Sequence, residues 1–140
     1  MNRARLAPLL FALLAGSSGC AGAFSCGLQD YKPLVVATTA PLKTVLEAAY
    51  EAAREAGATH VDLAEDELRV SAVFDEHEKT RERLRVQVTE WGEVSIDVRT
   101  EMLDKDSEWI APDRVCGDYH HSREREIADT ILAKVKLAAL

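Results

Sequence analysis

The stretch that decides the fold is residues 83–99, RLRVQVTEWGEVSIDVR. Apolar and polar residues alternate in both halves, which is the period of a β-strand with one face buried and the other in water. The glycine between the two halves is typical of a tight turn. The stretch therefore predicts two antiparallel strands of a sheet that is covered on one side only.

The length of the connecting loop sets the register of this hairpin. A two-residue loop pairs Val88 with Ser95, which puts an apolar residue on the polar face. A three-residue loop pairs Val88 with Val94 and places Gly92 at the left-handed position of a turn that ends in a bulge. We therefore predict the three-residue loop, because it keeps all the valines on one face.

The same register predicts the neighbours on the polar face. It sets Arg85 opposite Asp97, which is an attractive cross-strand pair. It also sets Arg83 opposite Arg99, and that like-charge pair is unfavourable unless Glu101 or Glu82 intervenes.

The rest of the chain supplies more strands and two helices. Apolar alternation predicts strands near residues 61–63 and 68–75, and a β-branched run predicts a short buried strand at 34–38. One helix is expected after Pro41, with its end at Gly57, and another over about 122–137. Each helix has a single apolar stripe.

These elements predict an α+β fold. A sheet with one apolar face and two helices with one apolar stripe each pack most simply as a two-layer sandwich, with a mainly antiparallel sheet and both helices on one face. At 140 residues, one domain is expected. We place it at 34–140, after a signal peptide at 1–19 and a lipidated linker at 20–33.

The N-terminus has the features of an export signal. Arg3 and Arg5 precede an uncharged apolar run at 6–15, which is too short to span a bilayer as a helix. The following Ser-Ser-Gly-Cys, ending at Cys20, resembles the lipobox of bacterial lipoproteins, although Ser17 stands where that family most often has leucine. The resemblance implies cleavage before Cys20 and a diacylglycerol on its thiol.

The lipobox resemblance also implies a location. It implies a protein exported and lipid-anchored to the cell envelope, and Ala21 after the cysteine favours the outer membrane, facing the periplasm. The competing cleavage site is Ala-Gly-Ala, ending at Ala23, which would release a soluble protein that begins at Phe24. The predicted architecture also resembles the small helix-grip-type domains of some envelope lipoproteins, including accessory subunits of outer-membrane assembly machinery.

Two cysteines lie outside the signal region. Exported compartments oxidise thiols, so Cys26 and Cys116 are expected to form a disulfide. A metal site is the alternative, because Cys116 is close in sequence to Asp118, His120 and His121, but the usual zinc spacing is absent. Two free thiols are the third possibility.

The sequence predicts a binding protein rather than an enzyme. It has no G-x-S-x-G, H-E-x-x-H or glycine-rich phosphate loop. Asp104, Asp106 and Glu108 alternate, but they lack the glycine and spacing of a calcium loop. We therefore expect no metal and no cofactor. A formal net charge of −7 argues against nucleic acid as a partner.

Trp91 is the candidate contact residue. At the tip of a hairpin it could contact a partner or a membrane, or fold back over the sheet. The leading hypothesis is a non-enzymatic envelope lipoprotein that binds or scaffolds another envelope component. The alternative is a soluble or anchored periplasmic small-molecule or metal-binding module that uses the concavity between sheet and helices. An enzyme would require His120 or His121 to meet a carboxylate.

Overall fold

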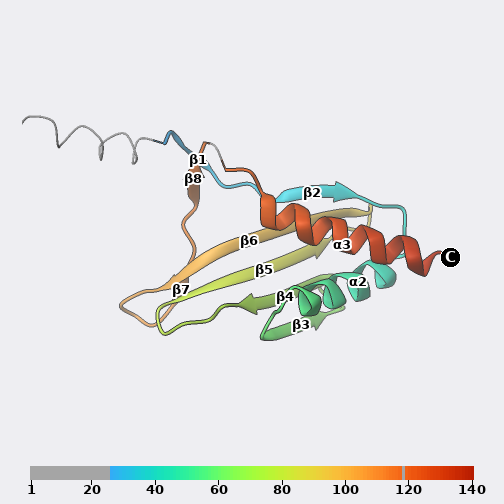
Figure 1. The fold of residues 1–140 in the computed structure, drawn as a ribbon, viewed down its shortest axis with the longest axis horizontal. Coiled ribbons are helices and arrows are strands. Elements are labelled where there is room, and N and C mark those ends of the chain that lie inside the picture. Colours follow the sequence, from blue (N-terminus) through green and yellow to red (C-terminus); the bar gives the residue numbers. More distant parts are fainter. Residues whose placement is uncertain (1–25, 118) are drawn as a thin grey trace, which may run out of the picture.

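The computed structural model describes residues 26–117 and 119–140, and it has the predicted α+β fold (Figure 1). The predicted signal peptide and Cys20 lie outside the described residues. The elements in chain order are β1 (Leu28–Asp30), β2 (Leu34–Ala37), α2 (Leu42–Glu55), β3 (His60–Ala64), β4 (Arg69–Phe74), β5 (Thr80–Val88), β6 (Glu93–Leu103), β7 (Trp109–Ile110), β8 (Arg114–Cys116) and α3 (Ser122–Ala138).

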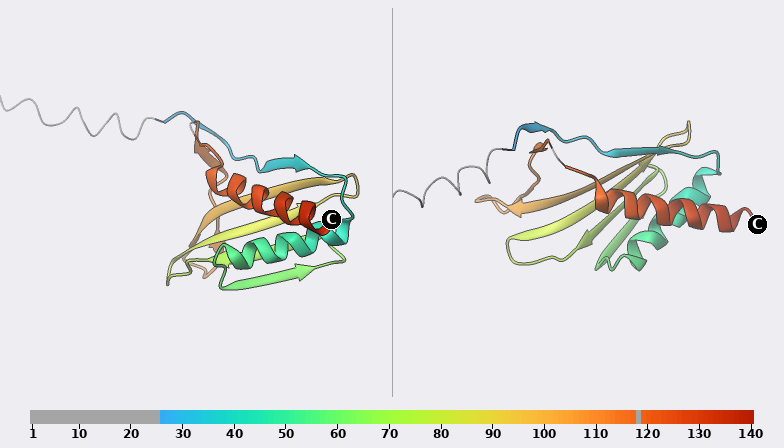
Figure 2. Two further views of the ribbon diagram at one scale, coloured as in Figure 1. Left: turned by 45° about the vertical axis from the view of Figure 1, so that its right-hand side comes forward. Right: turned by 45° about the horizontal axis from the view of Figure 1, so that its top comes forward.

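The main sheet has the strand order β2-β6-β5-β4-β3, with β7 added to β6, and every pairing is antiparallel. Both helices lie on the same side of this sheet (Figure 2). Helix α2 packs on β3, β4 and β5, whereas α3 packs on β6 and β2 and against α2. The predicted two-layer arrangement is confirmed.

The predicted hairpin register is also confirmed. Val88 pairs with Val94 across the β5–β6 turn, and Gly92 has a φ of +83°. The backbone N–H of Thr38 donates to the carbonyl oxygen of Gly92 at 2.9 Å. A side chain at position 92 would collide with the Thr38 carbonyl, so both the dihedral and the close approach require glycine.

The core lies between the sheet and the helices. Inward-facing residues of β4, β5 and β6 meet the apolar stripes of α2 and α3, and Leu84, Ile96 and Ile127 are among the completely buried side chains. Each contributes about 1.5–3 kcal/mol by removal from water. Alanines on α2, including Ala49 and Ala53, have no bulk that would hold the second helix away.

Two parts of the structure differ from expectation. The expected linker contains β1, which pairs with β8 to form a separate two-stranded sheet. The expected buried strand β2 is an edge strand, and Val35 is 54% exposed. An apolar run of four residues has too few positions to distinguish an edge strand from a central one.

The long sheet has two distinct ends. The β1–β8 pair lies at one end, and the β5–β6 connection and the C-terminus lie at the other (Figures 1 and 2). No helix in the described part of the chain is long and apolar enough to cross a membrane.

Candidate functional site

The face of the sheet that the helices leave open contains many arginines. Alternate residues of a strand point to the same side, so the polar positions of β4, β5 and β6 share this face. The arginine cluster, as we call it, consists of Arg69 on β4, Arg81, Arg83 and Arg85 on β5, and Arg99 on β6.

Two acidic residues neutralise part of the arginine cluster. Glu101, whose side chain is only 5% exposed, lies between two guanidinium groups: its carboxylate oxygens are 2.7 Å from Arg81 Nε and 3.1 Å from Arg83 Nε. Arg99 donates two hydrogen bonds to Asp97, at 2.9 and 2.8 Å. Glu101 thus pairs with two arginines of β5, whereas the carboxylate between the facing Arg83 and Arg99 is that of Asp97, 3.8 Å from Arg83 Nη2.

Arg85 has no acidic partner among the described residues. The register sets it opposite Asp97, as predicted, but the expected ion pair does not form because Asp97 is bound to Arg99 on the same strand. The prediction of that pair was wrong, because a long side chain two positions away reaches the carboxylate first. Burial lowers the pKa of Arg85, and the positive charges of neighbouring arginines lower it further.

A hollow of about 640 Å3 lies over β3, β4 and β5 on the open face. Its lining includes His60, Ser71, Arg85 and Trp109, together with the carboxylates of Asp62 and Glu101. The guanidinium of Arg81 lies 4.4 Å from the centre of the Trp109 ring, and a cation in this position is attracted to the aromatic face. The hollow therefore combines unused positive charge with one aromatic wall.

A second polar cluster is buried where α3 begins. Glu124 is completely buried, and one of its oxygens, Oε1, accepts hydrogen bonds from Tyr31 Oη at 3.0 Å and Tyr119 Oη at 2.5 Å. The other oxygen, Oε2, has no hydrogen-bond partner among the described residues. Burial and the Glu124 carboxylate raise the pKa of both tyrosines, so both hydroxyls remain protonated donors.

A cavity of about 410 Å3 adjoins this second cluster. Tyr31 and Tyr119 line it together with Arg99 and Arg123. The cavity therefore lies at one end of the sheet, near the first turn of α3. The expected concavity between sheet and helices is instead filled by side chains such as Ile96.

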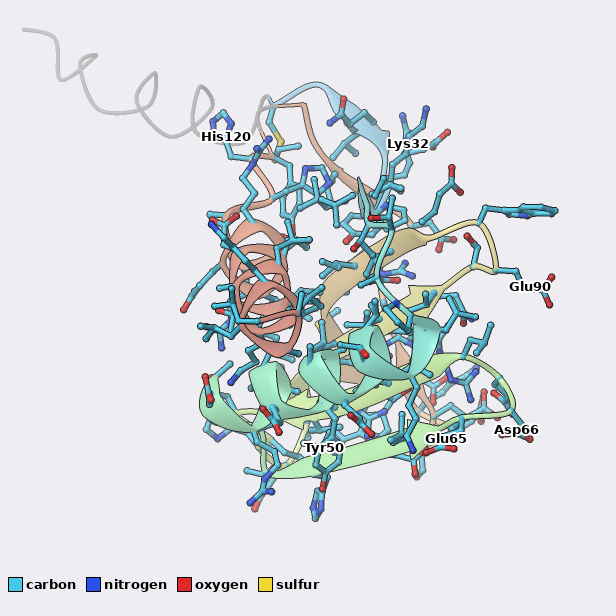
Figure 3. All side chains as sticks on the ribbon, turned by 90° about the vertical axis from the view of Figure 1, so that its right-hand side faces the viewer. Lys32, Tyr50, Glu65, Asp66, Glu90 and His120 are labelled. Atoms are coloured by element: carbon cyan, nitrogen blue, oxygen red, sulfur yellow. A yellow bond between two sulfur atoms is a disulfide. The ribbon has the colours of Figure 1, made fainter. Side chains whose placement is uncertain are left out.

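His120 and His121 lie at the start of α3. The His121 ring stacks edge-on with Tyr119 at 4.8 Å, and its Nε2 donates to the Lys32 carbonyl oxygen at 2.6 Å. His120 is exposed near the β1–β8 end (Figure 3). Within residues 26–117 and 119–140, no hydrogen bond joins either histidine to a carboxylate.

The expected disulfide between Cys26 and Cys116 is present. Cys116 is therefore not a free thiolate for a metal, and Asp118 lies outside the described residues. Among the residues that the structure describes, no group of three or more His, Cys, Asp or Glu is placed to hold a metal ion. Asp104 instead accepts hydrogen bonds from the backbone N–H groups of residues 106 and 108, at 2.8 Å each.

Trp91 is 87% exposed at the tip of the β5–β6 turn. Of the two alternatives that the sequence left open, the structure has the exposed one. The neighbouring Glu90 also points away from the sheet (Figure 3). Apart from Trp91, the larger exposed apolar residues lie in other segments, for example Val35 on β2.

Sequence reasoning missed both polar clusters as sites. Tyr31 fell in the expected linker, and an acidic residue such as Glu124 in the first turn of a helix is ordinarily explained by the helix dipole. The sequence did contain a signal for the arginine cluster. The predicted hairpin places Arg83, Arg85 and Arg99 on the same face of two neighbouring strands.

Comparison with known proteins gives no relative. The chain matches no protein-family model, no curated protein sequence and no solved structure. Its function is therefore argued from its own residues.

Proposed function

We propose that this protein is a non-enzymatic lipoprotein of the bacterial envelope, anchored through Cys20, that binds or scaffolds another envelope component. The observation that carries the proposal is the Cys26–Cys116 disulfide. Structural disulfides belong to oxidising compartments, which supports export. Because the chain has three cysteines, this bond leaves Cys20 as the thiol for a lipid.

The positions of the two ends of the sheet support this arrangement. Cys26 precedes β1 at one end, whereas Trp91 lies in the β5–β6 turn at the other. A lipid tether before Cys26 would leave the far end of the domain free for a partner. Exposed aromatic residues are favoured contact residues at protein interfaces, so Trp91 is the residue that we assign to partner contact.

The charge of the mature chain favours a lipid tether over adsorption. Cleavage before Cys20 removes Arg3 and Arg5 and no acidic residue, so the net charge of −7 becomes −9. An acidic domain is repelled by an anionic membrane surface. The anchor would therefore be the acyl chains on Cys20, with the protein facing the periplasm from the outer membrane.

The anchor is tested by the intact mass of protein purified from its native envelope, before and after reduction and alkylation. We expect a chain that starts at Cys20 and carries acyl chains, with two further thiols alkylated only after reduction. The matched variant Cys20→Ser should lack the lipid mass and keep the disulfide. A chain that starts at Phe24 without lipid would contradict the anchor.

Partner binding is tested with a photo-reactive residue at position 91 in cells. A control probe at Asp66, in the exposed β3–β4 turn, reports nonspecific labelling. We expect a defined adduct from position 91 and none from position 66, in a lipidated sample. Equal labelling at the two positions would contradict a partner site at the β5–β6 turn.

A periplasmic small-molecule-binding module, soluble or anchored, is the second candidate function. The cavity beside Tyr31 and Tyr119 favours it, because about 410 Å3 lies within the size range of small-molecule sites. Native mass spectrometry of protein from the envelope should then show a co-purifying ligand. Thr100→Trp, which fills the cavity from an exposed strand position, should remove that ligand.

A further inference from the structure

The arginine cluster contains more positive charge than its acidic neighbours neutralise. Four of its five guanidinium groups form ion pairs with three carboxylates, those of Glu67, Asp97 and Glu101. A fourth carboxylate, that of Asp62, faces Ser71 on the same side of the sheet, so one positive charge is left over on a face of a protein whose overall charge is −7. Asp62 lies two strands away from Arg85 in the register and forms no ion pair with the cluster among the described residues.

The unneutralised charge is centred on Arg85, and Arg69 is on the neighbouring strand β4. The Nε atoms of Arg69, Arg83 and Arg85 are buried and have no hydrogen-bond partner among the described residues, although Arg83 Nε lies 3.1 Å from a Glu101 oxygen. Arg69 has one ion pair, with the half-exposed Glu67, whereas Arg85 has none. A buried donor without a partner costs free energy, and more so when it is charged. The domain therefore maintains an unfavourable arrangement that an anion would relieve.

Arg85 is not needed to neutralise the carboxylate of Asp97. Arg99 already gives Asp97 two hydrogen bonds, at 2.9 and 2.8 Å, and Arg83 Nη2 lies 3.8 Å from the same carboxylate. Burial and three neighbouring arginines lower the pKa of Arg85, and the carboxylate of Asp97 acts in the opposite direction. A purely structural role would be served better by an uncharged polar residue.

The register places a third polar group between the two arginines. Ser71 lies directly opposite Arg85 and two residues along β4 from Arg69, so all three face the same side of the sheet. Two guanidinium forks and a hydroxyl are the donors that bind phosphate oxygens. The adjoining hollow of about 640 Å3 has the size of a small-molecule site.

We propose that the open face binds a small molecule through a phosphate group held by Arg69, Ser71 and Arg85. The rest of that molecule occupies the hollow beside Trp109. A free small molecule fits better than a lipid headgroup, because the acidic domain is repelled by an anionic membrane. The site does not depend on the lipid anchor or on partner contact at Trp91.

The test is a titration of the purified protein with inorganic phosphate, followed by backbone amide NMR at about pH 8, where phosphate is mainly a dianion. Sodium chloride keeps the ionic strength constant. We expect saturable shifts centred on β4 and β5, and a dissociation constant that rises when the total salt is raised.

The decisive variants are Arg85→Gln and Arg69→Gln. Each should raise the dissociation constant for phosphate about tenfold or more, as expected for loss of a charged hydrogen bond. The control Arg125→Gln removes the same charge from an exposed position on α3 and should leave it unchanged. If one variant fails to fold, the other gives the same comparison.

Three results would overturn the site. The first is the absence of saturable shifts in the wild-type protein. The second is equal weakening in Arg85→Gln and Arg125→Gln, which would show a general charge effect. The third is binding to vesicles of anionic lipid without saturable binding of phosphate. Loss of the lipid anchor or of crosslinking at position 91 would bear only on the proposed function.

Discussion

The two faces of the main sheet differ in what determines their contacts. On the helix-covered face, Val86 and Ile96 face each other and are both completely buried. On the open face, their neighbours Arg85 and Asp97 also face each other but form no ion pair. Short branched side chains touch whatever lies opposite, so register determines their contacts. Long arginines reach several positions, so competition for the available carboxylates determines theirs.

The largest expected effect is on the covered face. Ile96→Ala should lower the free energy of unfolding by about 2–5 kcal/mol, because it leaves a cavity in the packed layer. The adjacent Ser95→Ala, on the open face, should change it by less than about 0.5 kcal/mol. Urea unfolding measures both variants, and similar losses would remove the distinction between the faces.

Glu101→Gln tests the neutralised half of the arginine cluster. It should lower the free energy of unfolding by about 1–3 kcal/mol, because Arg81 and Arg83 lose the carboxylate that they share in a half-buried environment. Glu67→Gln, which removes a more exposed carboxylate from Arg69, should cost about 0–1 kcal/mol. An equal cost for the two variants in urea unfolding would contradict this account.

The buried tyrosines predict how stability depends on alkaline pH. Burial and Glu124 raise the pKa of Tyr31 and Tyr119, so these residues ionise in the unfolded chain first. Their contribution is complete below about pH 10 and is lost above it. Tyr119→Phe should reduce the slope of that loss by up to about 1.4 kcal/mol per pH unit. Urea unfolding at several alkaline pH values measures the slope, and an unchanged slope would contradict the raised pKa.

Trp91→Ala has the smallest expected effect on stability. Because the indole is 87% exposed, its loss should change the free energy of unfolding by less than about 0.5 kcal/mol. The urea midpoint measures this directly. A loss as large as that for Ile96→Ala would mean that the indole packs on the sheet, which would also remove Trp91 as a contact residue.

Much of the main sheet could be predicted from the sequence, for a physical reason. Alternation over residues 83–99 specifies which side chains are buried, and Gly92 is required by the turn geometry. The two helices were predicted by their apolar stripes, and Gly57, with a φ of +93°, stands just after the end of α2 as expected. In each case neighbouring residues contain the signal.

The other parts of the fold and both polar clusters depend on contacts between distant parts of the chain. The pairing of β1 with β8 joins three residues to three others almost the whole domain away, and so short a pairing leaves no local pattern. Glu124 meets Tyr31 across a separation of 93 residues. The missing partner of Arg85 depends on which arginine reaches Asp97, and the alternation of polar residues does not contain that information.

The most direct test of the account is the stability of Arg85→Gln with and without phosphate. If Arg85 binds a ligand and does not stabilise the fold, the variant should be at least as stable as the wild type in phosphate-free buffer. The reason is that the substitution removes a partly buried charge that lacks an acidic partner. Phosphate at constant ionic strength should then raise the melting temperature of the wild type and not that of the variant. A variant that is less stable in both buffers, with the same response to phosphate as the wild type, would contradict the account.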